Sequence, residues 1–417
     1  MASDSNTKTA QKTHRTICLP FYDEEYGKII DDAAQFRHFL DCIYEKMPEL
    51  FPPNFLQGYQ LKDSRMSKKL NIKIRRIELK DNSSYSIRPS FVMPYMTAYT
   101  QQVENPLFFR KFGVPFWALA HVFGRNPMYW YRLEVGLGRN SVVGTTVRTV
   151  KVPKHLLADE HHQTRDGEKS YIATTVGDGC FLGASVSETA AAEDLTRAYG
   201  VFKEEALNVE PHYTPETVNT DGWRSTQAAW KVLFPLIVVL QCFLHAWLKI
   251  RDRAKHLKDK FSDISKKVWH TYHSPNGRSF SQRIRRLRTW AQEHLEGIVQ
   301  NKVLELCSKR DLWKTAYDHP DGHRTSSMLD RVMRAMNRYF FDGQHLHGTH
   351  EASELHCRGW ALLHNFSPWN PATTKKNDGW TSPAERLNKH RYHKNWLQNL
   401  MVSASPGGYR YASPQNP

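Results

Sequence analysis

The chain has 417 residues, enough for two or three domains at about 150 residues each. An apolar content of 40% argues against a disordered chain, and the six cysteines, without a Cys-x-x-Cys pair, argue against a disulfide framework or a cysteine-based zinc finger. The formal net charge of +16 favours a polyanionic partner. No apolar run reaches the roughly 20 residues of a membrane-spanning helix and no secretory leader pattern is present, so we expect a cytoplasmic protein with no membrane partner.

The N-terminal part divides into a tail and a folded region. Residues 1–14 are polar and predict a disordered tail. Residues 15–104 form an N-terminal region in which apolar residues at helical spacing precede a β-hairpin. The hairpin is expected from Ile72 and Ile74, a turn over residues 80–84, and a second strand that begins at Tyr85.

Residues 105–150 predict a helix-turn-helix-like DNA-binding domain. Asn105-Pro106 is expected to open the first of three short helices, residues 115–123 form the second, and Asn126-Pro127 opens the third. The third helix would enter the major groove and contact DNA through Tyr129 and Arg132. A small helical bundle with the aromatic residues as its core remains an equally good interpretation of the spacing.

The following segment predicts a mixed α/β fold. Three strands are expected, then a helix and two further strands separated by a second helix; their residues are 154–159, 170–176, 180–186, 189–207 (helix), 216–220 and 236–240. This order is typical of a ribonuclease-H-like core, in which the first and fourth strands are neighbours. Charged helices over residues 249–320 would be inserted before the end of this core.

Two carboxylates are expected at the ends of these neighbouring strands. Asp159 would end the first strand and Asp221 follows the fourth, so both would lie at one gap in the sheet. Cleavage of a phosphodiester uses two divalent ions roughly 3.5–4 Å apart, which carboxylate oxygens hold. Each residue taken alone would be an ordinary solvated aspartate, but the pair in this strand order favours a site for two Mg²⁺ or Mn²⁺ ions.

These residues resemble a known family. Residues 218–230 and the segment 240–245 are similar to the core of DDE/D transposases of bacterial insertion sequences, and most similar to the Mutator-like group. In that group a Cys- or Asp-x-x-His motif follows the second catalytic aspartate, and Cys242 and His245 match it. The resemblance covers roughly residues 153–368. It implies a ribonuclease-H-like core with a helical insertion, and a homodimer or higher assembly.

The resemblance also implies a third acid on a helix. The family pattern, like Arg-Thr-Asn-x-x-Glu-Arg, corresponds to residues 324–331, with Asp330 in place of the glutamate. Ser327 and Asp330 also have the spacing of a helix capping box, which would make Asp330 structural. Glu351 and Glu354 are the alternative third acids.

The net charge is concentrated in the insertion. Residues 249–290 contain thirteen Lys or Arg against three Asp, a local excess of +10. A cluster of one sign is more typical of a surface that follows phosphates than of a solvated helix face. We expect DNA contacts from four of its arginines: Arg283, Arg285, Arg286 and Arg288.

The sequence therefore predicts a nucleoid-associated DNA transposase with Asp159, Asp221 and Asp330 as catalytic and metal-binding residues. It would bind element ends, cleave DNA and join the 3′ hydroxyl to target DNA. The core would comprise residues 151–248 and 321–402, followed by a flexible tail over residues 403–417. The alternatives are a non-catalytic DNA-binding protein derived from a transposase, and a nuclease on the same fold.

Overall fold

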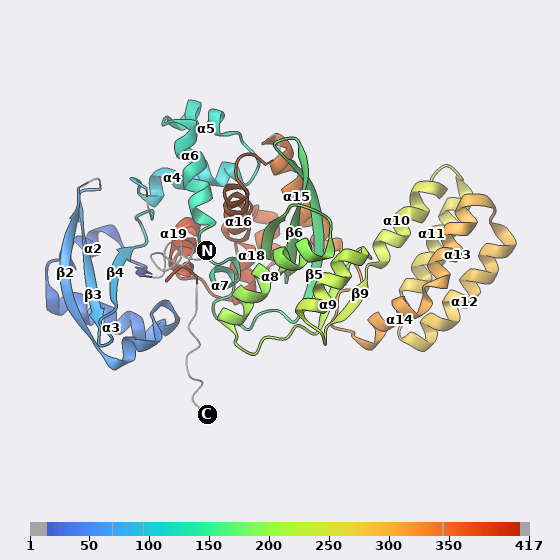
Figure 1. Cartoon of the computed structure of the whole chain (residues 1–417), viewed down its shortest axis with the longest axis horizontal. Coiled ribbons are helices and arrows are strands. Elements are labelled where there is room, and N and C mark those ends of the chain that lie inside the picture. Colours follow the sequence, from blue (N-terminus) through green and yellow to red (C-terminus); the bar gives the residue numbers. More distant parts are fainter. Residues whose placement is uncertain (1–14, 69, 95, 344–345, 409–417) are drawn as a thin grey trace.

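The computed structural model describes residues 15–68, 70–94, 96–343 and 346–408. The molecule is elongated: an N-terminal sheet lies at one end, a larger sheet covered by helices forms the middle, and a bundle of helices forms the other end (Figure 1). The predicted tails over residues 1–14 and 409–417 lie outside the described residues. Among the described residues, no helix combines the length and the apolarity needed to cross a membrane.

The N-terminal region contains a four-stranded sheet in the order β1-β4-β3-β2, with β1 parallel to β4. Its elements are β1 (Thr16–Leu19), α2 (Asp23–Ile29), α3 (Ala33–Lys46), the 3₁₀ turns η1 (Pro48–Leu50) and η2 (Pro53–Gln57), β2 (Tyr59–Ser67), β3 (Ile72–Leu79) and β4 (Ser84–Pro89). The expected hairpin is confirmed as β3 and β4. The two outer strands were not predicted, because β1 has only four residues and β2 is mostly exposed and polar, which leaves no apolar alternation to detect.

Four helices link this region to the central sheet: α4 (Thr100–Arg110), α5 (Phe116–Phe123), α6 (Pro127–Leu137) and α7 (Val142–Thr146). The second and third predicted helices are confirmed, and the side chain of Asn126 caps α6 by accepting from the amide of Met128. The predicted start of the first helix at Asn105-Pro106 is wrong, since α4 begins at Thr100 and Pro106 lies inside it. At the true start, six residues earlier, the side chain of Gln102 accepts from the amide of the N-cap residue Tyr99 at 3.3 Å.

The central sheet has the strand order β7-β6-β5-β8-β9. Strands β5, β6 and β7 form an antiparallel meander, while β8 and β9 run parallel to β5. The predicted neighbour relation between the first and fourth strands is therefore confirmed. The elements are β5 (His155–Arg165), β6 (Glu168–Gly177), β7 (Cys180–Ser187), α8 (Ala192–Val209), β8 (Thr217–Thr220), α9 (Arg224–Leu233) and β9 (Val238–Gln241).

The first strand of this sheet is longer than predicted. Strand β5 continues to Arg165, which pairs with Glu168 across a tight turn at Asp166 and Gly167. Both turn residues have positive φ, as an Asp-Gly hairpin turn requires. The expectation that Asp159 ends the strand is therefore wrong, and Asp159 lies near its middle.

Alternate residues of β5 face two different hydrophobic cores. Leu157 packs in the core shared with Met336 and Trp360, which belong to the C-terminal helices. Leu156 and Ala158 pack in the core shared with α8 and α9. Because side chains alternate along a strand, Asp159 is on the face of Leu157 and Glu160 is on the opposite face.

The predicted helical insertion is a separate five-helix bundle with its own core (Figure 1). Its helices are α10 (Phe243–Ala254), α11 (Asp259–Tyr272), α12 (Gly277–His294), α13 (Gly297–Ser308) and α14 (Arg310–Asp318). The first helix follows β9 directly, and the chain returns to the sheet after α14. The bundle therefore begins and ends beside β9.

The C-terminal part covers the sheet and closes back on the N-terminal region. It contains α15 (Ser327–Asp342), α16 (His350–Phe366), α17 (Pro371–Lys376), α18 (Pro383–Asn388) and α19 (Trp396–Ser403). The predicted flexible tail is wrong for residues 403–408, which are buried. Ser405 explains this, since its hydroxyl accepts from the amide of Cys18 at 2.9 Å and donates to the carbonyl of Leu50 at 3.1 Å.

Candidate active site

Asp159 and Asp221 lie at equivalent positions of two adjacent parallel strands. Strands β5 and β8 pair in register at Leu157 and Asn219, and each aspartate is two residues further along its strand. The carboxylate of Asp221 accepts from the amide of Trp223 at 2.8 Å, which fixes it at the start of α9. The structure therefore brings together the first two predicted site residues.

The electrostatic surroundings of Asp159 are unfavourable to its charge. Burial, followed by the charges of Glu160 and Asp221, raises the pKa of Asp159 from 3.8 to about 7, and the nearby His245 partly opposes this. The carboxylates of Asp159 and Asp221 thus repel one another where burial limits their hydration. Such a pair is stabilised by any cation that binds between its members.

The Cys-x-x-His segment lies at the same edge of the sheet. Cys242 is the N-cap of α10, and its amide donates to the carbonyl of Thr220 at the end of β8. Contact with the Cys242 side chain, and then the charges of Asp159 and Asp330, raises the pKa of His245 to about 9. Burial raises the pKa of Cys242, but the contacts with His245 and Ser326 outweigh it and lower that pKa. The charges of Asp159 and Asp330, the first and third predicted acids, therefore both favour the protonated form of His245.

Asp330 is held in the first turn of α15 by Ser326. The hydroxyl of Ser326 lies 3.1 Å and 3.2 Å from the two carboxylate oxygens of Asp330. The backbone amide of Ser326 donates to Sγ of Cys242 at 3.2 Å. The alternative capping box between Ser327 and Asp330 is not formed, since Ser326 is the N-cap residue and makes no side-chain cap. Asp330 thus connects through Ser326 to the Cys-x-x-His segment.

The two alternative third acids lie elsewhere. The carboxylate of Glu354 accepts from the amide of Val186 at 2.6 Å, on β7, which is the far edge strand of the sheet. Glu351 is exposed in the first turn of α16. Neither contacts Asp159, Asp221 or His245, whereas the charge of Asp330 is felt by His245. The geometry favours Asp330.

The residue after Asp159 along β5 is also an acid, but its side chain does not face the site. Glu160 is buried on the opposite face of the sheet, where it accepts from the hydroxyls of Tyr199 at 2.6 Å and Thr226 at 2.7 Å. Its charge contributes to the raised pKa of Asp159. The sequence could have shown that Asp159 and Glu160 point to two different faces only if β5 had been predicted to continue past residue 160, because side chains alternate along a strand.

The donor set fits a hard divalent cation. Carboxylate oxygens are the ligands that Mg²⁺ and Mn²⁺ prefer. Among the residues that the structure describes, none of Asp159, Asp221 and Asp330 is ion-paired with a lysine or arginine, so their charges are available to a metal. Within the same described ranges, no three His, Cys, Asp or Glu side chains are grouped closely enough to hold a metal as they stand. A metal ion would therefore first bind the carboxylates of Asp159 and Asp221.

A crevice joins the acidic edge of the sheet to the basic bundle. Asp221 lines it from the sheet side, and the bundle lines it with His245, Lys249, Lys302, Glu305 and Lys309. Both of the last two lysines are ion-paired with Glu305, at 2.7 Å and 3.1 Å, so Lys249 is the lysine in this crevice without a carboxylate partner among the described residues. The crevice thus has one acid, Asp221, on the sheet side, and three lysines together with Glu305 on the bundle side.

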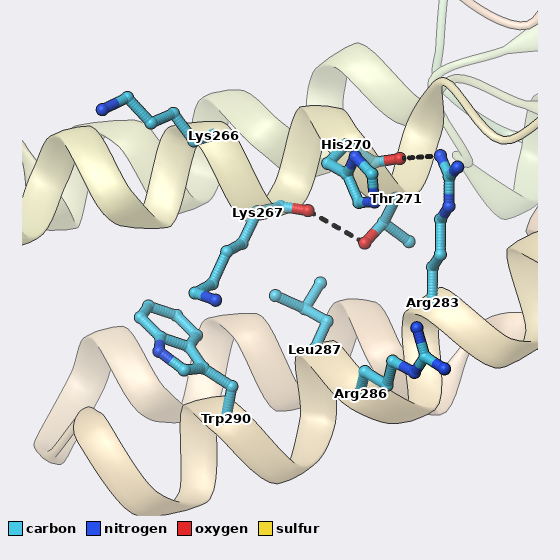
Figure 2. Close-up of a pocket in the computed structure, with 8 residues that line it drawn as sticks. All are labelled: Lys266, Lys267, His270, Thr271, Arg283, Arg286, Leu287 and Trp290. Carbon is cyan, nitrogen blue, oxygen red and sulfur yellow. Dashed lines mark hydrogen bonds between the residues drawn. The ribbon is translucent and has the colours of Figure 1, made fainter.

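The four predicted DNA-binding arginines fall on two sides of α12. Arg283 and Arg286 line a groove of about 450 Å³ between α11 and α12. Arg285 and Arg288 are exposed outside this groove. Figure 2 shows the groove with Lys267 and Trp290 at one end and the two arginines at the other. Trp290 and the lysines of α11 were not predicted as site residues, although the spacing of Arg283, Arg286 and Trp290 places them on one helix face.

The predicted helix-turn-helix residues lie in a more apolar setting than expected. Arg132 is exposed on α6, but Tyr129 is half-buried, with the Arg125 guanidinium 5.4 Å from its ring centre. The neighbouring Trp130 is buried, and α6 packs its inner face against α16. The exposed side chains around α5 are largely apolar: Phe109, Phe112, Trp117, Val122, Phe123 and Met128. The small-bundle interpretation accounts for these contacts better than a basic recognition surface does.

Comparisons with known proteins were made for the whole chain. No model of a protein family matches it, and no curated protein matches it. Among solved structures, the chain is similar to a chain of the cryo-EM structure of the simian T-cell lymphotropic virus intasome in complex with PP2A regulatory subunit B56 gamma. The identity is 13%, the match covers 43% of this chain and 66% of that chain, just under two thirds of its length, and the TM-score is 0.18. A TM-score this low carries no argument, so we base the function on the geometry of the site.

Proposed function

We propose that the protein is a DNA transposase with a ribonuclease-H-like core. The observation that carries the proposal is the placement of Asp159 and Asp221 at equivalent positions of the adjacent parallel strands β5 and β8, where their charges repel. Carboxylates on neighbouring strands could hold the metal ions that two-ion phosphodiester cleavage uses, which supports the proposal. The strand order β7-β6-β5-β8-β9 and the bundle inserted after β9 support the same proposal.

Asp159, Asp221 and Asp330 would hold two Mg²⁺ or Mn²⁺ ions. Bound ions of this kind activate the attacking water or 3′ hydroxyl and stabilise the leaving oxygen. The chain's own contribution is to fix the carboxylates: the amide of Trp223 orients Asp221, and the hydroxyl of Ser326 orients Asp330. The positive charge of His245, which Asp159 and Asp330 favour, offsets part of the repulsion between the acids.

The substrates would be the ends of the mobile element and a target DNA. The basic bundle lies directly beside the acids through the crevice lined by Asp221 and Lys249, so DNA bound by the bundle would pass the carboxylates. Two element ends must be cut together, which calls for a homodimer or a higher assembly. Because the surface around α5 is apolar, we assign the DNA contacts chiefly to the bundle.

The test is metal-dependent cleavage of a plasmid that carries the DNA flanking the coding sequence. We expect the wild-type protein to nick this plasmid with Mg²⁺ or Mn²⁺ and to join the freed ends to a second plasmid. Asp159→Asn, Asp221→Asn and Asp330→Asn should each lower the cleavage rate by at least about a hundredfold while leaving DNA binding intact. Asp252→Asn, an exposed aspartate on α10, serves as the matched control and should cleave normally.

The alternatives give different outcomes in the same experiment. Cleavage without joining would identify a nuclease on the same fold. Binding without cleavage by the wild-type protein would identify a non-catalytic DNA-binding protein. Full activity of Asp330→Asn with loss of activity in Glu351→Gln or Glu354→Gln would move the third acid to α16.

A further inference from the structure

The helical bundle contains a groove whose lining combines cations with an aromatic face. Residues Lys266, Lys267, His270 and Thr271 of α11 and Arg283, Arg286, Leu287 and Trp290 of α12 line this groove, which has a volume of about 450 Å³. Volumes of about 300–1,000 Å³ are typical of sites for small groups such as a nucleotide. We call this space the α11–α12 groove.

The cations of the groove are not neutralised by the protein. Among the described residues, none of Lys266, Lys267, Arg283 and Arg286 is ion-paired with a carboxylate. Arg283 donates to the carbonyl of His270 at 2.7 Å and so ties the two helices together. The ammonium of Lys267 and the guanidinium of Arg286 make no hydrogen bond to a described group, and Lys267 lies 4.9 Å from the ring centre of Trp290. The ammonium of Lys267 and the guanidinium of Arg286 can therefore attract an anionic ligand.

The aromatic side chain distinguishes this groove from an ordinary phosphate-binding surface. Trp290 is only partly buried, although the adjacent Leu287 is 3% exposed and forms the apolar floor. Figure 2 shows the indole at one end of the groove with Lys267 reaching toward it, and Arg283 and Arg286 at the other end. The ammonium of Lys267 lies over the ring of Trp290, and His294 stacks against the same indole with 5.6 Å between ring centres. A base that displaces one of these side chains would stack on the indole while its phosphates meet lysine and arginine. A base paired within a duplex has no free face for this contact.

We propose that the α11–α12 groove binds an unpaired stretch of DNA, with a base stacked on Trp290 and its phosphates at Lys267 and Arg286. This inference rests on the proposed function for the choice of DNA, but it concerns a site separate from the three acids. It also divides the arginines of α12: Arg283 and Arg286 belong to the groove, while Arg285 and Arg288 do not.

The test measures binding of a fluorescein-labelled oligothymidylate of about 12 nucleotides, and of a duplex of the same length, by fluorescence anisotropy in EDTA. The groove variant is Lys267→Gln with Arg286→Gln, and the control is Lys28→Gln with Lys46→Gln, which removes the same charge from exposed positions of the N-terminal region that have no proposed DNA contact. We expect the groove variant to bind the single strand at least about tenfold more weakly, with the salt slope reduced by about 1.4 for two lost phosphate contacts. The control should bind within about threefold of the wild type.

The aromatic contact is tested separately. Trp290→Ala should weaken single-strand binding by about 5- to 150-fold, the effect of losing one stacked base, and leave duplex binding unchanged. Trp290→Phe keeps an aromatic face and should restore part of the loss, which guards against an effect on folding. If groove and control variants bind the single strand equally, or if Trp290→Ala weakens both DNA forms equally, the inference is overturned. Because the binding assay is run in EDTA, its result does not depend on a bound metal. If the wild-type protein binds single strands in this assay but does not cleave DNA with Mg²⁺ or Mn²⁺, the proposed function is contradicted and this inference stands.

Discussion

Arg110 and Glu134 form an ion pair in the interior of the protein, with Nε of Arg110 2.6 Å from Oε2 of Glu134 and side chains that are 3% and 0% exposed. A second nitrogen of Arg110 donates to the hydroxyl of Tyr339 at 2.6 Å, and that hydroxyl also bonds to Glu134. The three residues belong to α4, α6 and α15. The pair therefore joins the helices before the central sheet to the helix that carries Asp330.

Removal of one partner should be costly. Glu134→Ala leaves the Arg110 charge buried without its counter-charge, and we expect the free energy of unfolding to fall by about 3–5 kcal/mol. The matched control is Glu216→Ala, which breaks an exposed pair with Lys154 whose side chains are 50% and 56% exposed, and should cost less than about 1 kcal/mol. Urea unfolding of both variants checks this. Equal losses would show that the interior pair contributes no more than a surface pair.

The same pair predicts a loss of stability in acid. Burial opposes the charge of Glu134, but Arg110 outweighs it and lowers the pKa of Glu134 from 4.5 to about 2. A carboxyl with a depressed folded-state pKa stabilises the fold above its unfolded value, and this contribution is lost as the pH falls from about 4.5 toward 2. At about 1.4 kcal/mol for each pKa unit, the loss amounts to about 3 kcal/mol. Unfolding midpoints measured across this range should fall more steeply for the wild type than for Glu134→Gln; parallel curves would contradict the assignment.

The crossing of α6 and α16 predicts opposite effects for two nearby glycines. A Cβ added at Gly138 would lie 1.9 Å from the carbonyl oxygen of Leu355, so Gly138→Ala must force the helices apart. We expect it to lower the free energy of unfolding by about 1–3 kcal/mol or more. Gly136, inside α6, has no atom within 4 Å of an added Cβ, so Gly136→Ala should raise stability by about 0.5–1 kcal/mol. Thermal unfolding of the two variants should shift in opposite directions.

The charge of Asp159, which the proposed chemistry needs, should lower the stability of the fold. Burial, then the charges of Glu160 and Asp221, raises the pKa of Asp159 to about 7, so its contribution to stability falls as the pH rises from about 3.8 to 7. Asp159→Asn removes the repulsion and should raise the free energy of unfolding at pH 8 by about 1–4 kcal/mol. Saturating Mn²⁺ should stabilise the wild type by about 2–3 kcal/mol and stabilise Asp159→Asn much less. A destabilised Asp159→Asn, or equal effects of Mn²⁺ on the two proteins, would contradict this prediction.

The sequence predicted the parts of the fold that depend on local signals. The Asp-Gly pairs at Asp166 and Asp178 are such signals, because a two-residue hairpin turn needs positive φ at both positions, and each turn has it. The meander and its parallel partner followed from apolar runs of the right length, so the proximity of Asp159 and Asp221 could be inferred. The outer strand β2 could not be predicted, since its side chains are mostly exposed and their pattern resembles that of a loop.

The remaining errors concern features that depend on tertiary contacts. Asp159 was expected at a strand end because the residues after it are polar, yet Gln163 and Ser170 of the β5–β6 hairpin are buried, and α15 packs against β5. The roles of Asp330, Glu351 and Glu354 could not be separated by spacing, because Glu354 is occupied by the amide of Val186 only once β7 and α16 are packed. The arginines of α12 form one sequence cluster but divide between two faces, since only Arg283 and Arg286 lie toward α11.

Helix α15 has Asp330 in its first turn and Tyr339 near its other end, about 14 Å away at 1.5 Å for each residue. Tyr339 is fixed by Arg110 and Glu134, and Asp330 is fixed by Ser326. Because the helix is continuous, its two ends cannot be repositioned independently. A displacement of α4 or α6 would therefore be passed along α15 toward Asp330, the proposed third acid, and the helices beside the N-terminal sheet would take part in aligning the proposed site.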